Sequence, residues 1–329
     1  MAIARHGTGS RAAAAALASQ IHPVFMLPPL AASVFGAVLA GRFAPAPLGF
    51  HAASTFFAVY TAHVKDGYVD FYRRGEDDDH PLTAAGCRLA LVGATLCFVS
   101  VTAVLGAVSG PLTALLTVPM WILGYLHAPQ SDTNPVTTTL GYPLGIALAV
   151  VGGHHAQNGA VAAEALAFGL VFLVALAGVK IIDDSTDYAY DRSIGKRTVA
   201  VALGVRRARW LAYALLYAGF TLVLVFAVDG VFPPSSPLAA AAFGLVAVAA
   251  AGAGPSVATM LLVRGAYVFL AGLVVAVWFR PLSGLPLPDI GVLGPYTYLA
   301  TEVVFGGGAF ALLRRADAVW RAARTILVL

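Results

Sequence analysis

The sequence contains few charged residues: Asp, Glu, Lys and Arg make up only 11% of its 329 residues, against about 25% in an ordinary soluble domain. Lysine occurs at only three positions, and the formal net charge is a modest +4. So little charged surface does not suit a water-soluble fold. The basic residues are better explained by membrane orientation than by nucleic-acid binding, so no nucleic-acid partner is expected.

Cysteine is also scarce. The two cysteines, Cys87 and Cys97, both lie in or beside an apolar stretch. Neither belongs to a metal-binding spacing or a disulfide framework. We interpret both as small buried hydrophobic residues.

Apolar residues are abundant, at 59% of the chain with a mean hydropathy of +0.83. This composition predicts an all-α integral membrane protein whose partner is the lipid bilayer. Spans need roughly 20 apolar residues, and nine or ten are expected around a central cavity open to the cytoplasmic side. The apolar segments are 23–41, 47–64, 86–107, 111–126, 138–153, 159–182, 209–228, 237–253, 257–278 and 294–313. They form one predicted transmembrane domain, 23–313, between an N-terminal segment, 1–22, and a basic tail, 314–329.

Basic residues are distributed unevenly between the two sides of the predicted bundle. If the segments alternate, sixteen of the twenty Lys and Arg residues fall on the side of the N-terminus, the loops near 65–85 and 183–208, and the tail. An excess of basic residues marks the cytoplasmic side. We therefore predict a multi-pass protein of the cell membrane with its N-terminus and both loops cytoplasmic. The number of membrane spans is nine, not ten, if one of the last segments lies in the membrane–water interface and does not cross the bilayer.

Acidic residues gather in these two loops. Asp66 and Asp70 are four residues apart, so a helix continuing from residue 47 would carry both on one face. Asp184, Asp187 and Asp191 have i,i+3 and i,i+4 spacing and would form a stripe on another helix. An even number of segments separates the loops, so the two acidic clusters can face one another and build one site.

Carboxylates stacked on one helix face repel each other, and near a membrane this repulsion is less screened than in water. Divalent cations relieve it, and Mg²⁺ typically takes one or two carboxylates and bridges to phosphate oxygens. Mg²⁺ together with Arg and Lys suits a diphosphate. The alternative is that the acidic loops merely keep a cytoplasmic surface soluble. The basic residues near the acids are Lys180, Arg73, Arg74, Lys196 and Arg197.

The stretch DDSTDYAYDRSIGKRTVAVALG (183–204) resembles the second aspartate-rich motif of the UbiA superfamily of intramembrane prenyltransferases, roughly (N/D)-D-x-x-D-x-x-x-D-R-x-x-G-K-x-T. KDGYVDFYRRGED (65–77) is similar to its first motif, and DFYRRGED resembles the members that prenylate dihydroxynaphthoate. The positions after the second and sixth helices also agree. Departures are the motif-one Asn, replaced by Asp66 or Lys65, the usual Arg-Pro, here His80-Pro81, and a family count of nine helices.

This resemblance implies Mg²⁺-dependent transfer of a polyprenyl group from its diphosphate to a lipophilic acceptor, through an allylic carbocation. It implies two or more Mg²⁺ ions. Asp183 would cap a helix or form a supporting hydrogen bond. The expected metal ligands, of which the first four are also the expected catalytic residues, are Asp66, Asp70, Asp184, Asp187 and Asp191. The expected diphosphate-site residues are Lys180, Arg73, Arg74, Lys196 and Arg197, with Asp77 as a further ligand or an acceptor-orienting group.

The acceptor is predicted to be an aromatic quinone precursor. The alternatives within the family are a haem, a chlorophyll precursor, a glycerophosphate ether lipid and a carotenoid. His127 and Asn134, in the loop before the fifth segment, are weaker candidates for contact with the acceptor. Two alternatives lie outside the family. One is a CDP-alcohol phosphotransferase, but DGYVDF lacks the Ala-Arg of the signature of that class. The other is a transporter, which would place charges at mid-membrane rather than at one end of the helices.

Overall fold

The computed structural model describes residues 2–284, and every element found there is helical. The nine long helices of this part coincide with the first nine predicted segments, whereas the segment 294–313 lies outside it. The long helices are α2 (Pro23–Leu39), α3 (Pro45–Val69), α4 (Ala84–Ser109), α5 (Pro111–Tyr125), α6 (Pro135–Asn158), α7 (Ala163–Thr186), α10 (Val205–Val228), α11 (Ser236–Ala251) and α12 (Pro255–Phe279). The short elements are α1 (Gly9–Ala18), α8 (Tyr188–Ser193), α9 (Val199–Leu203), a π-helical turn (Asp70–Arg74) and a 3₁₀ turn (Ser131–Thr133).

Proline marks the starts of many helices. It is the first residue of α2, α3, α5, α6 and α12, where its fixed φ suits a helix and its missing N–H is not needed. Helix α4 begins differently, since the hydroxyl of Thr83 accepts a hydrogen bond from the backbone N–H of Gly86 at 2.9 Å. These local signals explain why the apolar segments of the sequence break where they do.

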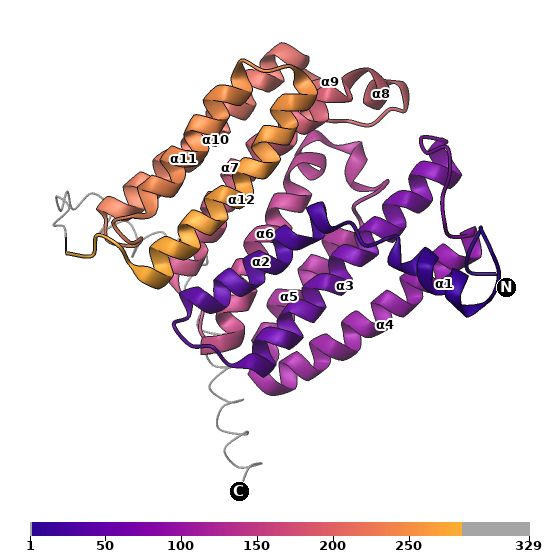
Figure 1. Ribbon diagram of the computed structural model, residues 1–329, viewed down its shortest axis with the longest axis horizontal. Helices are drawn as coiled ribbons and strands as arrows, with labels where there is room; N and C mark the ends of the chain where they lie inside the picture. The colour runs from indigo at the N-terminus through magenta and orange to yellow at the C-terminus, as the bar shows by residue number, and fades with distance from the viewer. Residues whose placement is uncertain (1, 285–329) are drawn as a thin grey trace, which may run out of the picture.

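The helices form two groups, with α7, α10, α11 and α12 on one side and α2–α6 on the other (Figure 1). Helices α6 and α7 pack together where the groups meet, and α2 packs against α6. Glycines allow this close approach: a Cβ at Gly36 or Gly153 would collide with the backbone of the partner helix, and one at Gly178 would meet the backbone of Ala212 on α10. Small residues are the usual means of packing membrane helices closely.

The outer surface of the bundle is apolar. Leu89, Val92 and Leu96 of α4 are each half-exposed or more, which suits contact with lipid rather than water. Cys87, on the opposite face of this helix, is buried as predicted. The same prediction is wrong for Cys97, which is exposed on the outer surface.

Within residues 2–284, five helices, α4, α6, α7, α10 and α12, are long and apolar enough to cross a membrane. A sixth span is possible if α1 and α2, which meet at a bend of 66°, are counted as one. Helices α5 and α11 are apolar but shorter, and α3 carries Lys65 and Asp66 near its end. The all-α, multi-pass membrane protein is thus supported, while the predicted nine or ten spans are not confirmed by this measure.

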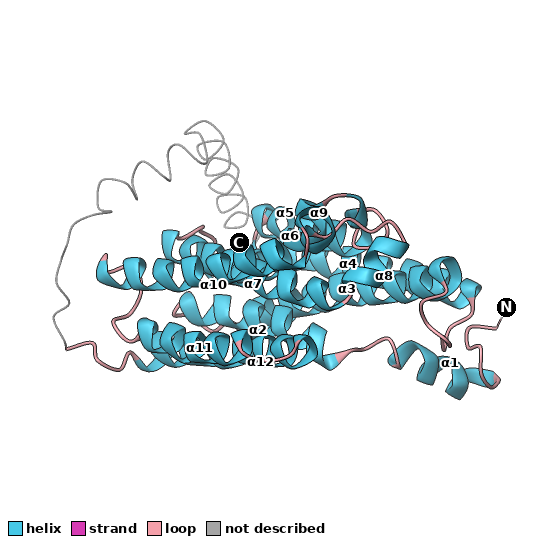
Figure 2. Cartoon of the chain, turned by 90° about the horizontal axis from the view of Figure 1, so that it is seen from above, coloured by secondary structure: helices cyan, strands magenta, loops and turns pink. Residues whose placement is uncertain are grey.

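The segment before α1 is attached to the first acidic loop. Ala4 forms an isolated β-bridge with Leu82, and the backbone N–H of Arg5 donates to the carbonyl of Pro81 at 2.8 Å. The side chains of Arg5 and His6 pair with Asp79 at 3.4 and 2.9 Å. Figure 2 shows α1 beside the bundle at the end that carries these loops. The N-terminal segment therefore fixes part of the loop that follows α3.

Candidate active site

A cavity of about 670 Å³ extends from the acidic loops into the bundle, between α2, α3, α5, α6, α7 and α12. Its wall near the loops carries charged groups, among them Asp66, Asp70 and Asp183. Deeper, the wall is apolar and includes Ala32, Phe172 and Leu270, on three different helices. Acids of both motifs line this cavity, Asp66, Asp70 and Asp77 from the first and Asp183 from the second, so the two motifs lie together at one end of the bundle.

Helix α3 and the π-helical turn that continues it supply the first group of acids. Asp66 and Asp70 both line the cavity, as their spacing predicted. After Val69 the helix widens into the π-helical turn, a distortion frequent at functional sites. The pKa of Asp70 is raised to about 7, mainly by burial and then by the negative charges of Asp66 and Glu76. The site thus holds a carboxylate whose charge is poorly compensated.

Arg74, at the end of this turn, pairs with Asp70 at 3.2 Å and with Asp132, from the loop between α5 and α6. Burial opposes the charge on Arg74, but the hydrogen bonds and charges of Asp132 and then Asp70 raise its pKa. Sequence reasoning missed Asp132, because it stands outside both motifs and no spacing links it to them. Arg74 was predicted to bind diphosphate, and the structure places it between two carboxylates.

Three histidines near Asp66 also line the site, although little in the sequence indicated that they would. His22, His63 and His127 all line the cavity. The rings of His22 and His63 stack with centroids 4.9 Å apart, and Nε2 of His127 lies 4.0 Å from a carboxylate oxygen of Asp66. His127 was a weak candidate for acceptor contact, and its position fits. Asn134 instead caps α6 by accepting from the N–H of Val136.

Helix α7 supplies the second group. Nζ of Lys180 lies 2.7 Å from Asp184, the i,i+4 partner predicted from sequence, and 3.1 Å from Asp183. Lys180 and Asp183 line the cavity, whereas Asp184 is buried behind them, with 2% of its side chain exposed. Asp183, expected to have a supporting role, is therefore the acid of this pair that faces the cavity.

The helix predicted to carry Asp184, Asp187 and Asp191 as one stripe is interrupted. Helix α7 ends at Thr186, and Asp187 is an exposed residue between α7 and α8. The hydroxyl of Thr186 donates to the carbonyl of Asp183 at 2.7 Å, which competes with continued helical bonding. Asp187 therefore does not share a continuous helical face with the other two, although its role as a ligand stays a prediction.

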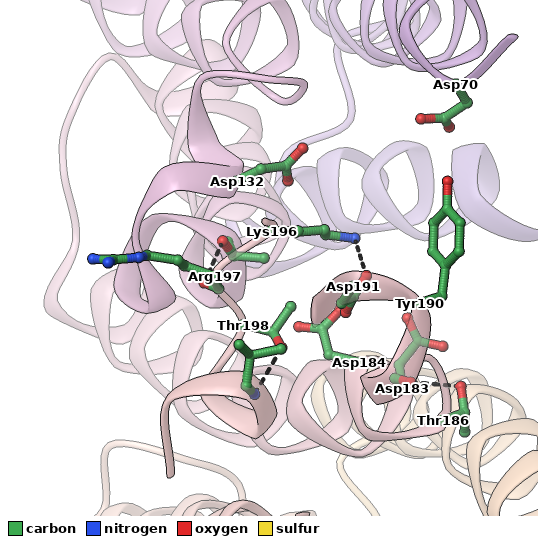
Figure 3. Close-up of polar contacts among 12 residues, drawn as sticks. Asp70, Asp132, Asp183, Asp184, Thr186, Tyr190, Asp191, Lys196, Arg197 and Thr198 are labelled. Carbon is green, nitrogen blue, oxygen red and sulfur yellow. Dashed lines mark hydrogen bonds and ion pairs between the residues drawn. The ribbon is translucent and has the colours of Figure 1, made fainter. Parts of the chain in front are cut away.

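Asp191, on α8, turns back toward Asp184 (Figure 3). Its Oδ1 lies 3.4 Å from Nζ of Lys196, and 2% of its side chain is exposed. Burial is the main cause that raises the pKa of Asp191. Within residues 2–284, Oδ2 of Asp191 and Oδ2 of Asp184 are both buried without a hydrogen-bond partner. Two buried carboxylates, each with one oxygen tied to a lysine and one free, fit a site for a hard cation.

The remaining predicted residues lie at the margin of the site. Asp77 lines the cavity from the loop after the π-helical turn, and Arg73 is exposed on that turn. The guanidinium of Arg197 points away from Asp191 in Figure 3, while its backbone N–H donates to the carbonyl of Asp132 at 2.7 Å. The structure thus brings Lys180 and Lys196 to the acids, but not the side chain of Arg197.

In the described part of the chain, no three acidic, histidine or cysteine side chains converge closely enough to hold a metal ion by themselves. Mg²⁺ does not require this, since it usually combines one or two carboxylates with water and phosphate oxygens. The free oxygens of Asp184 and Asp191, and the carboxylate of Asp70, are suitable donors. The residues present therefore fit Mg²⁺ bound jointly with a diphosphate.

An acid-lined opening above an apolar cavity, within a helical membrane bundle, is the arrangement of an intramembrane enzyme acting on a lipid with a charged head. The model of the UbiA prenyltransferase family matches residues 27–254. The chain belongs to this family, and it is a prenyltransferase. The resemblance seen in the two motifs is thereby confirmed, and the phosphotransferase and transporter alternatives are set aside. No match is found among curated proteins.

Solved structures share the fold at low sequence identity. One, described in a study of digeranylgeranylglyceryl phosphate synthase in membranes, is 12% identical with a TM-score of 0.63, over 80% of this chain and 99% of that one. A UbiA homologue from Aeropyrum pernix K1 is 17% identical with a TM-score of 0.63, over 78% and 98%. A homologue from Archaeoglobus fulgidus, bound to GPP and Mg²⁺, is 15% identical with a TM-score of 0.51, over 82% and 99%.

Proposed function

We propose that the protein transfers a polyprenyl group from a prenyl diphosphate to an aromatic quinone precursor, with two or more Mg²⁺ ions. The observation that carries the proposal is the single cavity that joins the acidic groups of both motifs to an apolar interior. The Archaeoglobus fulgidus homologue, with GPP and Mg²⁺ bound, supports the same donor class here. The metal ligands are Asp66, Asp70, Asp184, Asp187 and Asp191, with Asp77 as a further ligand or an acceptor-orienting group.

The reaction breaks the bond between the first prenyl carbon and the diphosphate oxygen. Mg²⁺ held by these aspartates would supply positive charge that stabilises the departing diphosphate. Lys180 and Lys196, each held by a buried aspartate, add cationic groups where negative charge grows. Arg73, Arg74 and Arg197 are assigned to the same diphosphate site, the last requiring its side chain to turn inward.

The apolar part of the cavity keeps water from the allylic cation that remains. Phe172, Leu176 and Leu270 line this part and offer no competing nucleophile. The aromatic ring of Tyr142, also on the wall, can stabilise a nearby cation through its π-face. The cation then forms a bond with the acceptor, which loses a proton.

An aromatic acceptor is supported by flat groups beside Asp66. The stacked rings of His22 and His63, with Phe25 6.2 Å from His63, form a surface on which a planar ring can lie. A glycerophosphate ether lipid or a carotenoid is the alternative acceptor. The dihydroxynaphthoate-like motif DFYRRGED favours the aromatic class.

The test is an incubation of the purified protein, in nanodiscs, with labelled geranylgeranyl diphosphate, Mg²⁺ and one acceptor at a time. We expect a prenylated product with dihydroxynaphthoate or hydroxybenzoate, and none with the ether lipid or the carotenoid. The Asp70→Asn variant should form no product. Product from the ether lipid alone would refute the acceptor class, and equal turnover in EDTA would refute the use of Mg²⁺.

The proposal includes the orientation and organisation expected from the sequence. The N-terminus and both acidic loops face the cytoplasm, on the basis of the basic residues on that side. A single transmembrane domain, 23–313, lies between the N-terminal segment 1–22 and the tail 314–329, and its end lies outside the described residues. Cysteine-accessibility labelling of right-side-out vesicles, with a reporter cysteine at Asp78, tests this orientation; labelling from outside would refute it.

A further inference from the structure

Arg74 is shared between two carboxylates that belong to different parts of the chain. Its Nη1 lies 3.2 Å from Oδ1 of Asp70, one turn earlier on the same helix, and its Nη2 pairs with Oδ2 of Asp132. Arg74 and Asp132 expose only 15% and 11% of their side chains. An arginine this close to Asp70 occupies an oxygen that a divalent cation bound there would need.

Asp132 is itself held in place from two directions. It lies in the 3₁₀ turn Ser131–Thr133, and its carbonyl accepts a hydrogen bond of 2.7 Å from the backbone N–H of Arg197. The hydroxyl oxygen of Thr138, at the start of α6, lies within hydrogen-bond distance of the carbonyls of both Ser131 and Arg197, at 2.8 and 3.2 Å, and can donate its proton to either. The backbone of Asp132 is therefore fixed by the end of the second motif, and its carboxylate contacts Arg74 at the end of the first motif.

Resting on the proposed function, in which Asp70 binds a divalent cation, we propose that Asp132 is a positioning residue that draws Arg74 away from Asp70. With Asp132 in place, Arg74 keeps a carboxylate partner when a cation takes the Asp70 oxygen. Without it, Arg74 has only Asp70, and the cation must displace the guanidinium from its remaining partner. A half-buried cation left unpaired is costly, so the exchange at Asp70 becomes less favourable.

The consequence is a coupling between Asp132 and cation affinity that acts through Arg74. A partly exposed ion pair contributes up to roughly 1 kcal/mol, so removal of Asp132 should weaken cation binding about fivefold. A direct, through-space effect of the lost negative charge would be present whether or not Arg74 is there. A double-mutant comparison therefore separates the two causes.

The experiment measures Mn²⁺ binding to the metal-free, full-length protein in detergent, saturated with a non-reactive prenyl diphosphate analogue, by the loss of the EPR signal of free Mn²⁺ relative to a sample with the analogue and no protein. Mn²⁺ is the probe because it accepts the carboxylate ligands that suit Mg²⁺. We expect Asp132→Asn to raise the dissociation constant about fivefold in the wild-type background and to have no effect in the Arg74→Gln background. Asp132→Glu, which keeps the carboxylate, should bind as the wild type does. Asp78→Asn, which removes one charge from an exposed loop position, serves as the matched control.

Three results would overturn the inference. An equal weakening in both backgrounds would mean that Asp132 acts by charge or by folding, without Arg74. Unchanged affinity in Asp132→Asn would mean that Asp132 does not act on the cation at all, although the proposed function would stand if Asp70→Asn still removed one of the Mn²⁺ sites. An unchanged number and affinity of bound Mn²⁺ ions in Asp70→Asn would overturn both the inference and the assignment of Asp70 as a ligand.

Discussion

Replacing Asp191 by Asn tests whether this buried carboxylate stabilises the fold or is kept for a cation. Its Oδ1 contacts Lys196, its Oδ2 has no partner within residues 2–284, and it lies close to a second buried acid, Asp184. A structural carboxylate would have both oxygens satisfied. We therefore expect that, in the absence of Mg²⁺, Asp191 does not contribute to stability.

The magnitude follows from what the substitution removes and adds. A buried polar atom without a partner costs about 1–3 kcal/mol, and an amide NH₂ in place of Oδ2 can donate to Asp184. The lost pair with Lys196 offsets this by roughly 1 kcal/mol or less, because that lysine is 23% exposed and can be hydrated. The metal-free variant should be as stable as the wild type or more stable by about 1 kcal/mol, a rise of about 2–4 °C in Tm.

Thermal unfolding followed by tryptophan fluorescence, in detergent, measures both parts of this prediction. In EDTA, the variant should unfold at the wild-type temperature or above it. With Mg²⁺ and a non-reactive prenyl diphosphate analogue at 100 times Kd, the wild type should gain about 2.7 kcal/mol and the variant much less. A variant that is markedly less stable in EDTA, or that gains as much as the wild type from the ligands, would refute the reasoning; Asp78→Asn is the control for charge.

Three further substitutions test the packing around the site. Gly178→Ala should force α7 away from the backbone of α10 at Ala212 and lower stability by about 1–3 kcal/mol, whereas wild-type stability would show that the helices separate freely. Thr83→Ala removes the N-cap of α4 and should cost about 1 kcal/mol, measured by thermal unfolding, and an unchanged Tm would contradict this. Asp79→Asn releases Arg5 from the acidic loop, so hydrogen exchange in the N-terminal segment should become faster with little change elsewhere; unchanged exchange would show that the backbone bonds suffice.

Local spacing predicted the parts of the site that lie within one helix. Asp66 and Asp70 share a face because α3 continues without a break into the π-helical turn, and Lys180 meets Asp184 because i and i+4 are neighbours on α7. The same reasoning failed at Asp187, where hydroxyl side chains compete for the last carbonyls of α7 and end it. Helix periodicity therefore predicts neighbouring side chains only for residues that lie within one uninterrupted helix.

Contacts between helices were outside the reach of this reasoning. Asp132 has no motif around it, and it becomes important only because the loop between α5 and α6 lies next to the π-helical turn. The exchange of roles between Asp183 and Asp184 depends on the rotation of α7 about its axis, which is set by its packing against α6 and α10. Sequence spacing gives neighbours on one helix, but not the direction in which the shared face points.

The pairing of lysines with single carboxylate oxygens explains how the second motif can be buried before a cation arrives. Asp184 and Asp191 expose almost none of their side chains, and two unpaired carboxylates there would be expelled or protonated. Lys180 and Lys196 each form an ion pair with one carboxylate oxygen, and these pairs stabilise the two buried negative charges. In the part of the chain that the structure describes, the second oxygen of each carboxylate has no hydrogen-bond partner. If both oxygens were satisfied by the protein, the site would be stable but unable to bind a metal ion. The arrangement gives up part of that stability so that the remaining oxygens stay available to a cation that arrives with the diphosphate.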